Sequence, residues 1–199
     1  MTTFFAGFFL SLSLILAIGS QNAFILKQGI KKQHIVLICT ICAISDAILI
    51  SLGIAGFGAI VNKYPAIEMY ARYGGALFLF VYSVLSFKSA FSQSHILKAE
   101  SGVENSTLKT VAICLAFTWL NPHVYLDTMV LLGSISTQYE GKQIEFGLGA
   151  VLASFTFFFS LGFGARLLAP IFQKPKSWQV LEFIVGLTML IIALTLVFR

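Results

Sequence analysis

Six long apolar runs, separated by short polar connections, constrain this 199-residue chain more than any other feature. A run of about 20 apolar residues is long enough to cross ~30 Å of hydrocarbon as an α-helix. Lipid offers the backbone no hydrogen bonds, so each spanning segment must satisfy its own polar groups. We therefore predict an all-α integral membrane protein with six transmembrane helices, at about Phe4–Leu26, Ile35–Val61, Met69–Phe87, Leu108–Leu132, Ile144–Leu168 and Trp178–Phe198.

The composition agrees with a lipid bilayer as the surroundings of the chain. Charged residues make up 11% of the sequence and the mean hydropathy is +0.91, whereas soluble domains are about 25% charged. The net charge of +5 does not indicate nucleic acid, because the basic residues form short clusters between apolar runs. The polar connections are too short for a second soluble domain, so we expect a single membrane domain over residues 1–199.

The distribution of Lys and Arg predicts the orientation of the spans. Connections one, three and five hold nine of these residues and the opposite side holds four, which together make the 13 in the chain. The positive-inside bias therefore places these three connections in the cytoplasm and both termini in the periplasm. In this interpretation Lys27, Lys31 and Lys32 set the topology. Three spans per half give the halves opposite orientations, so we predict two inverted three-helix repeats, about 1–95 and 105–199.

Two of the predicted spans are interrupted by polar, helix-breaking residues, one in each half. The first contains Gly19-Ser20-Gln21-Asn22, and the fourth contains Trp119-Leu120-Asn121-Pro122-His123. Proline removes a helical hydrogen bond, and an unsatisfied amide in lipid costs several kcal/mol. Interrupted apolar segments in corresponding positions of two halves indicate a transport site near the midplane of the membrane.

Asp46 lies about 11 residues into the second predicted span, close to the bilayer centre at 1.5 Å per residue. A bare carboxylate at that depth costs ~3 kcal/mol or more, so it is expected to face a cavity or a partner. We interpret Asp46 as a cation or proton site. The alternative is a protonated or capped carboxyl group that holds two helices together.

The fourth span carries a second acid, Asp127, and further polar groups on two faces. At helical spacing His123 and Asp127 share one face, and Asn121 and Tyr125 share another. A helix that breaks before Pro122 allows both faces to converge on one site and frees backbone carbonyls as ligands. The alternative is an i,i+4 pair of His123 and Asp127 that satisfies itself.

Gln21 and Asn22 are the matching amides of the first span. A carboxamide both donates and accepts hydrogen bonds, so these side chains suit a ligand that bears an ammonium and a carboxylate. The alternative is that they cap the frayed end of the first helix. No metal motif, phosphate loop or nucleophile motif is present in the sequence, and we expect no cofactor.

Three stretches of the chain resemble the bacterial basic-amino-acid exporters, the lysine and arginine exporters among the LysE-type translocators. They are residues 19–32 (GSQNAFILKQGIKK), 43–46 (AISD) and 118–127 (TWLNPHVYLD). The resemblance implies an inner-membrane protein that exports L-arginine or L-lysine, coupled to the membrane potential or the proton gradient. One difference is that the family usually has proline where this chain has Ser20, so we expect a less pronounced first break that depends on Gly19 alone.

The leading hypothesis is a secondary exporter that works by alternating access and is not an enzyme. Asp46, with Asp127, receives the cationic side chain of the substrate. The amides of Gln21, Asn22 and Asn121 hold the amino-acid head group. Export of a cation opposes a negative-inside potential, so an incoming proton is the expected coupling ion. The sequence leaves open the choice between lysine and arginine, and whether the chain forms a homo-oligomer.

Two other functions stay open at this point. Asp46, Asp127 and His123 could serve an exporter of a metal cation, although we count only two acids within the spans and hard divalent ions prefer six or more oxygens. Cys39 and Cys42 form a CxxC pair that could serve an intramembrane thiol oxidoreductase.

Overall fold

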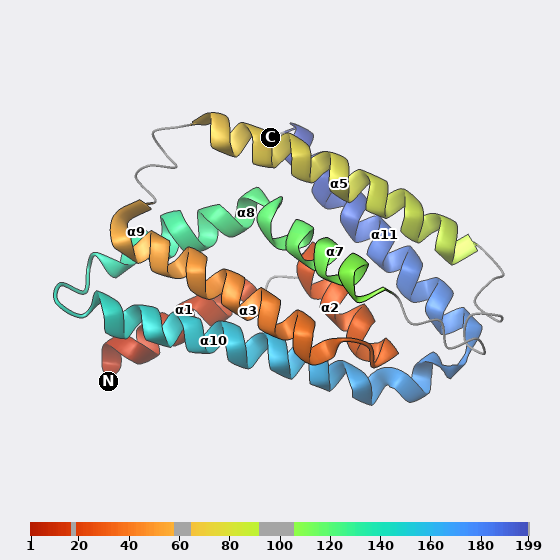
Figure 1. Cartoon of the computed structure of the whole chain (residues 1–199), viewed down its shortest axis with the longest axis horizontal. Coiled ribbons are helices and arrows are strands. Elements are labelled where there is room, and N and C mark those ends of the chain that lie inside the picture. Colours follow the sequence, from red (N-terminus) through yellow and green to blue (C-terminus); the bar gives the residue numbers. More distant parts are fainter. Residues whose placement is uncertain (17–18, 58–64, 92–105, 199) are drawn as a thin grey trace.

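The computed structural model describes residues 1–16, 19–57, 65–91 and 106–198, and all regular structure within these ranges is helical. The end of the second predicted span (58–61) and most of the long third connection (92–105) lie outside the described residues. The elements, shown in Figure 1, are α1 (Thr2–Ile15), α2 (Ser20–Lys31), α3 (Ile35–Leu52), the π-helix η1 (Gly53–Phe57), α5 (Pro65–Phe91), α7 (Thr107–Trp119), α8 (Pro122–Tyr125), the π-helix η2 (Leu126–Leu131), α9 (Leu132–Ser136), α10 (Gln143–Gly164), the 3-10 helix η3 (Ala165–Gln173) and α11 (Pro175–Phe198).

Among the described residues, four segments are long and apolar enough to cross a membrane unbroken: Ile35–Gly56, Arg72–Phe91, Gln143–Phe172 and Pro175–Phe198. The pair α1 and α2, bent by 82° between the two helices, makes a fifth if it is counted as one span. The fourth predicted span is divided, because α7 has only 13 residues and ends at the second break. The all-α membrane class is therefore confirmed with four or five apolar spans, and the arrangement in six inverted helices stays a prediction.

The helices lie side by side in a bundle (Figure 1). Helix α5 packs along α11, α1 packs along α10, and α3 lies against both α10 and α7. The closest approaches occur at glycines: a Cβ atom at Gly75 of α5 would overlap the carbonyl of Leu120, and one at Gly149 of α10 would overlap the carbonyl of Phe4. Small residues at helix contacts are typical of membrane bundles, where packing replaces the hydrophobic effect as the driving force.

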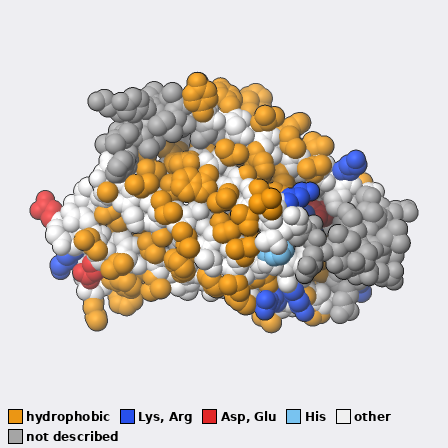
Figure 2. All heavy atoms as spheres, in the orientation of Figure 1, with side chains coloured by type: hydrophobic (Ala, Val, Ile, Leu, Met, Phe, Trp, Pro, Cys, Tyr) orange, Lys and Arg blue, Asp and Glu red, His pale blue; other side chains and the backbone are white. Residues whose placement is uncertain are grey.

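The outer surface of the bundle is apolar. Hydrophobic side chains dominate the face seen in Figure 2, and charged side chains appear mainly towards its left and right ends. On α5 and α11, large side chains such as Leu77, Phe80, Ile184 and Ile191 are exposed. A soluble protein rarely exposes so large an apolar surface. A helix that contacts lipid needs apolar side chains on its outer face.

Candidate substrate site

The first break is present in the structure although proline is absent. Helix α1 ends at Ile15 and α2 begins at Ser20, with Gly19 in an extended conformation before it. The side-chain Nδ2 of Asn22 donates a 2.9 Å hydrogen bond back to the carbonyl of Ile15. Asn22 thus satisfies a carbonyl that the interruption releases from α1, as the capping alternative proposed.

The second break lies between α7 and α8 and is stabilised by side chains on both sides. Asn121 is extended, and its Oδ1 accepts a 3.1 Å hydrogen bond from the backbone N–H of His123. Pro122 occupies the first position of α8, where its missing N–H has no cost. The hydroxyl of Tyr125 donates a 2.7 Å hydrogen bond to the carbonyl of Trp119, across the break.

Beyond this break the helix continues in π geometry over Leu126–Leu131, which contains Asp127. A π-helix is rare and often occurs at a functional site, because the extra residue in its turn changes where side chains point. The predicted i,i+4 face of His123 and Asp127 therefore does not extend along a regular helix here.

Asp46 lies in the middle of α3 and is almost fully buried, with 4% of its surface exposed. Its Oδ2 accepts a 2.7 Å hydrogen bond from the hydroxyl of Ser154 on α10. The carboxyl group thus links two helices, as the capping interpretation expected, and it also faces the cavity described next.

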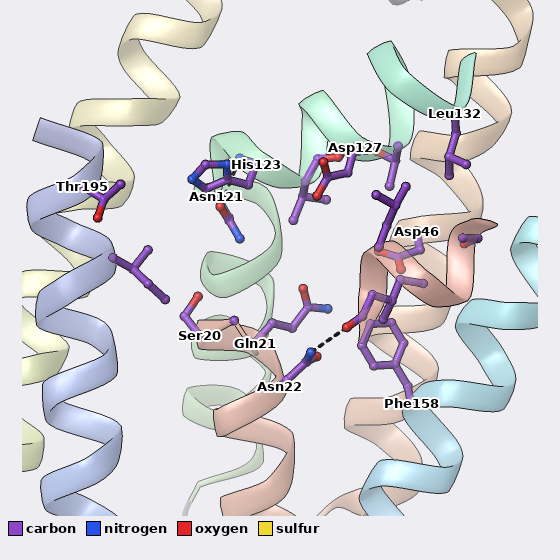
Figure 3. A pocket seen from close by; sticks show the side chains of 17 residues that line it. Ser20, Gln21, Asn22, Asp46, Asn121, His123, Asp127, Leu132, Phe158 and Thr195 are labelled. Atoms are coloured by element: carbon purple, nitrogen blue, oxygen red, sulfur yellow. Dashed lines mark hydrogen bonds between the residues drawn. The ribbon is translucent and has the colours of Figure 1, made fainter. Parts of the chain in front are cut away.

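A cavity of about 350 Å³ lies where α1, α2, α3, α11 and the segment after the second break meet (Figure 3). This volume falls within the range of ligand pockets. Eight of the predicted site residues line the cavity: Gly19, Ser20, Gln21, Asn22, Asp46, Asn121, His123 and Asp127. Pro122 and Tyr125 are not among the lining residues, and both act within the break itself. The structure therefore brings Asp46 and both breaks to one place.

One side of the cavity carries polar groups whose hydrogen bonds are not made. Among the described residues, the Ser20 hydroxyl and the Nε2 of Gln21 are buried without a hydrogen-bond partner. A neighbour of Gln21 is the thiol of Cys42, a weak acceptor. An unsatisfied buried group costs ~1–3 kcal/mol. A bound polar ligand can recover that free energy. These groups also lie in the first turn of α2, whose end carries a partial positive charge.

The other side of the cavity carries acidic side chains. Asp46 and Asp127 contribute two carboxyl groups, and no Lys or Arg is found among the described residues that line the cavity. Within the described ranges no group of three or more His, Cys, Asp or Glu side chains is placed to hold a metal ion. The cavity therefore combines carboxylates at one side with hydrogen-bond donors at the other.

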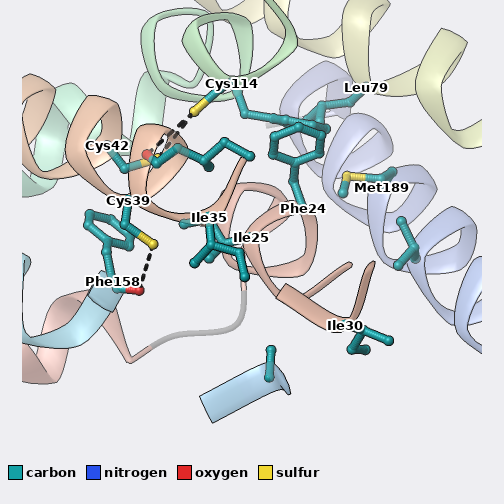
Figure 4. Close-up of a cluster of buried hydrophobic side chains, with 14 of the residues drawn as sticks. Phe24, Ile25, Ile30, Ile35, Cys39, Cys42, Leu79, Cys114, Phe158 and Met189 are labelled. Carbon is teal, nitrogen blue, oxygen red and sulfur yellow. Dashed lines mark hydrogen bonds between the residues drawn. The ribbon is translucent and has the colours of Figure 1, made fainter. Parts of the chain in front are cut away.

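The cysteines of the CxxC pair point to different partners. The thiol of Cys39 donates a 3.1 Å hydrogen bond to the carbonyl of Phe158, and the sulfur of Cys42 lies 3.4 Å from that of Cys114 (Figure 4). All three thiols are free and buried. They pack in the main hydrophobic cluster together with Phe24 and Phe117, as small apolar groups do.

Comparison with known proteins identifies the family. Residues 12–199 match the family described as LysE type translocator. The chain belongs to the LysE-type translocator family. It is accordingly a membrane transporter and not an enzyme, which removes the thiol oxidoreductase alternative.

Several curated relatives of this LysE-type translocator match over nearly its whole length. A putative amino-acid transporter of Mycobacterium tuberculosis H37Rv is 41% identical over 182 residues, which cover 92% of this chain and 90% of the relative. The arginine exporter protein ArgO of Escherichia coli K12 is 40% identical over 194 residues, 97% of this chain and 92% of the relative. ArgO of Pectobacterium atrosepticum is 41% identical over 191 residues, with coverage of 96% and 94%. No solved structure matches the chain.

Several residues of this translocator were not recognised from its sequence. Ser154, which binds Asp46, is a serine inside an apolar run and carries no signal of its own. The count of two acids within the spans was wrong, because Glu145 and Glu182 also lie in the fifth and sixth predicted spans, and Glu182 is buried. Its partner is Lys27, which was interpreted only as a topology determinant. The rule that an intramembrane acid indicates function would have found Glu182.

Proposed function

We propose that this translocator exports basic amino acids, L-arginine and/or L-lysine, across the bacterial inner membrane. The observation that carries the proposal is the meeting of Asp46 and both helix breaks in one cavity. The names of the relatives support it, since the ArgO proteins are arginine exporters. Sequence similarity alone supports amino-acid export in general. The two acids and the absence of Lys and Arg among the described lining residues favour a cationic substrate.

In the proposed complex, Asp46 and Asp127 receive the ammonium or guanidinium group of the substrate side chain. Attraction between opposite charges grows as the dielectric constant falls, so a buried carboxylate selects a cation better than one in water. The α-carboxylate of the substrate binds the first turn of α2 with Ser20 and Gln21, because helix N-termini favour anions. Asn121 and His123 complete the head-group site. Asn22 stabilises the first break through its hydrogen bond to the carbonyl of Ile15.

The transport cycle that we propose is alternating access between two inverted repeats, about residues 1–95 and 105–199. Helix contacts support this arrangement: α3 packs on α10, and α5 packs on α11, so that corresponding helices of the two halves meet as pairs. The cavity at the two interrupted spans is where inverted repeats hold their substrate. Rocking of one half against the other opens this cavity first to the cytoplasm and then to the periplasm.

Coupling to an incoming proton completes the proposal. Moving one positive charge out of the cell costs ~2.3 kcal/mol per 100 mV of negative-inside potential. A proton that moves inward for each exported cation removes this cost. The carboxyl groups of Asp46 and Asp127 are the groups in the cavity that can exchange a proton for the substrate cation.

The decisive experiment is transport in proteoliposomes with imposed pH and potential gradients. Arginine, lysine and canavanine are compared with citrulline, which has nearly the shape of arginine but no charge, and with divalent metal ions. The proposal expects saturable movement of the basic amino acids, with little for citrulline or the metals. Equal transport of citrulline and arginine would show that charge is not recognised, and movement of metals alone would revive the metal exporter.

A further inference from the structure

A second cavity, of about 750 Å³, lies at the end of the bundle next to the predicted cytoplasmic connections. The residues around it come from the end of α2 and of α5, the start of α7 and of α11, and η3. About half of the described residues that line it are apolar. The charged ones are Lys27, Lys31, Lys109 and Glu182, and Tyr82 lies beside the pair of Lys27 and Glu182. The proposed function leaves this cavity without a role.

Glu182 on α11 and Lys27 on α2 form a buried ion pair at this cavity. The ammonium nitrogen of Lys27 lies 2.6 Å from Oε1 and 2.8 Å from Oε2 of Glu182, with side-chain exposures of 12% and 3%. It also lies 5.7 Å from the centre of the Tyr82 ring. Removing both charges from water costs about as much as their attraction returns, so a buried pair is weak evidence for stability. This pair therefore calls for an explanation beyond the joining of two helices.

The chemistry of the pair suggests that explanation. The side chain of Lys27 ends in the same butylammonium group that free lysine carries, and the carboxylate of Glu182 binds it with both oxygens. A carboxylate beside an aromatic face also suits guanidinium, which stacks on rings and binds carboxylates through two N–H groups. The large cavity around the pair leaves space for the backbone part of a free amino acid.

We propose that Glu182 and Tyr82 form a second binding site for the cationic side chain of the transported amino acid, occupied by Lys27 until a free substrate displaces it. The ligand class rests on the proposed function, since an exported basic amino acid arrives from this end. The site itself rests on the ion pair and the cavity.

The two cavities lie one after the other along α2. Gln21 lines the first cavity, Phe24 and Lys27 line the second, and Gln21 and Lys27 are separated by about 9 Å at 1.5 Å per residue. Phe24, between them, packs on Phe117 with ring centres 5.2 Å apart, and Tyr82 packs on the same ring at 4.9 Å. Phe24 and Tyr82 thus both contact the Phe117 ring, and Tyr82 also lies beside Lys27 in the second cavity.

The test uses n-butylammonium as the probe and thermal stability in detergent as the measure of binding. Lys27→Met removes the internal competitor, so we expect n-butylammonium to stabilise this variant at a concentration about tenfold lower than the wild type needs. The double variant Lys27→Met/Glu182→Gln should lose this response. Lys176→Met, which removes an exposed lysine at the same end, should behave as the wild type. An equal response of the single and the double variant overturns the proposal.

Lys27→Met also leaves a buried carboxylate unpaired, which is destabilising in itself. If the variant is recovered only in poor yield, n-butylammonium during purification should restore it, and failure to restore it overturns the proposal. Asp46→Asn combined with Lys27→Met should keep the response to n-butylammonium. This result does not require transport, so the second site and the proposed function can fail separately.

Transport distinguishes a binding role from a structural one. If the ion pair only joins two helices, the double variant Lys27→Met/Glu182→Gln leaves no unpaired buried charge. It should then export arginine with the half-saturation concentration of the wild type. The proposal instead expects the half-saturation concentration on the cytoplasmic side to rise by about tenfold, with the maximal rate reduced less. A wild-type value for this folded double variant would overturn the second site.

Discussion

The hydroxyl of Ser154 donates a 2.7 Å hydrogen bond to Oδ2 of Asp46, and so joins α10 to α3 at the wall of the first cavity. Both side chains are buried, with 0% and 4% of their surface exposed. A hydrogen bond between two buried side chains fixes the carboxyl group in one orientation. Ser154, from the second half of the chain, therefore fixes the position of Asp46, which lines the first cavity.

Asp46→Asn should abolish most export. The amide keeps the shape of the side chain but cannot attract a cation, so we expect a loss of at least about tenfold, equivalent to ~1.4 kcal/mol or more. The readout is release of arginine or lysine from cells fed with dipeptides. Glu145→Gln is the matched control, because it removes an acid that pairs with the N-terminus outside the cavity. If Asp46→Asn exports at the normal rate, the assigned role of Asp46 is wrong.

Ser154→Ala should weaken substrate binding without unfolding the protein. The lost hydrogen bond to a charged group contributes ~1.5–3 kcal/mol where it is fully formed, and part of that acts on binding, so we expect a rise in half-saturation of about threefold to tenfold. Thr156→Val, at an exposed position of the same helix, controls for the removal of a hydroxyl group. Equal transport kinetics of the two variants would show that the Ser154 bond does not position Asp46 for binding.

Substitutions of Asn121 can separate capping of α8 from contact with the substrate. Its Oδ1 caps the helix, and loss of a cap costs ~1 kcal/mol. Asn121→Ser keeps a capping oxygen but loses the amide nitrogen, so we expect wild-type thermal stability with weaker binding. Asn121→Ala should lower both stability and affinity. The measurements are thermal unfolding in detergent and half-saturation in proteoliposomes, and full transport by the serine variant would leave Asn121 with a capping role alone.

The neighbouring glycines of α5 provide a matched pair for the second break. A Cβ atom at Gly75 overlaps the carbonyl of Leu120, whereas one at Gly74 meets nothing within 4 Å. Gly75→Ala should therefore push α5 away from the break and destabilise the protein by ~1–3 kcal/mol, with loss of transport. Gly74→Ala should be neutral or stabilising, because alanine favours a helix. Equal thermal unfolding temperatures for the two variants would contradict this packing.

The predicted topology can be checked with reporter fusions and thiol labelling. Both termini and the fourth predicted connection, Gly133–Gln143, should report a periplasmic location, while the third, Lys88–Thr107, should report the cytoplasm. The reason is the excess of Lys and Arg on one side. A C-terminal fusion that reports the cytoplasm while the N-terminus stays periplasmic would leave an odd number of spans and exclude two three-helix repeats.

Sequence patterns predicted much of the fold and several of the residues that line the first cavity. Apolar length located the helices, because lipid requires about 20 residues per span, and proline with asparagine located the break before Pro122. The patterns did not predict that α1 would end at Ile15, since proline is absent there and Gly19 is only permissive. They also did not predict Ser154 as the partner of Asp46, because 108 residues separate the two along the chain.

The sequence by itself determined that the protein lies in a lipid bilayer, where its apolar segments are, which polar residues interrupt them, and to which family it belongs. These are properties of local composition, since hydropathy and helix breaking act over one or two turns. Only the tertiary structure decided that Asp46 and both breaks share one cavity, and that Lys27 is paired with Glu182 rather than exposed at a connection. Such contacts depend on how helices distant in sequence pack together. The sequence of one apolar helix does not indicate which other helix each of its side chains will contact.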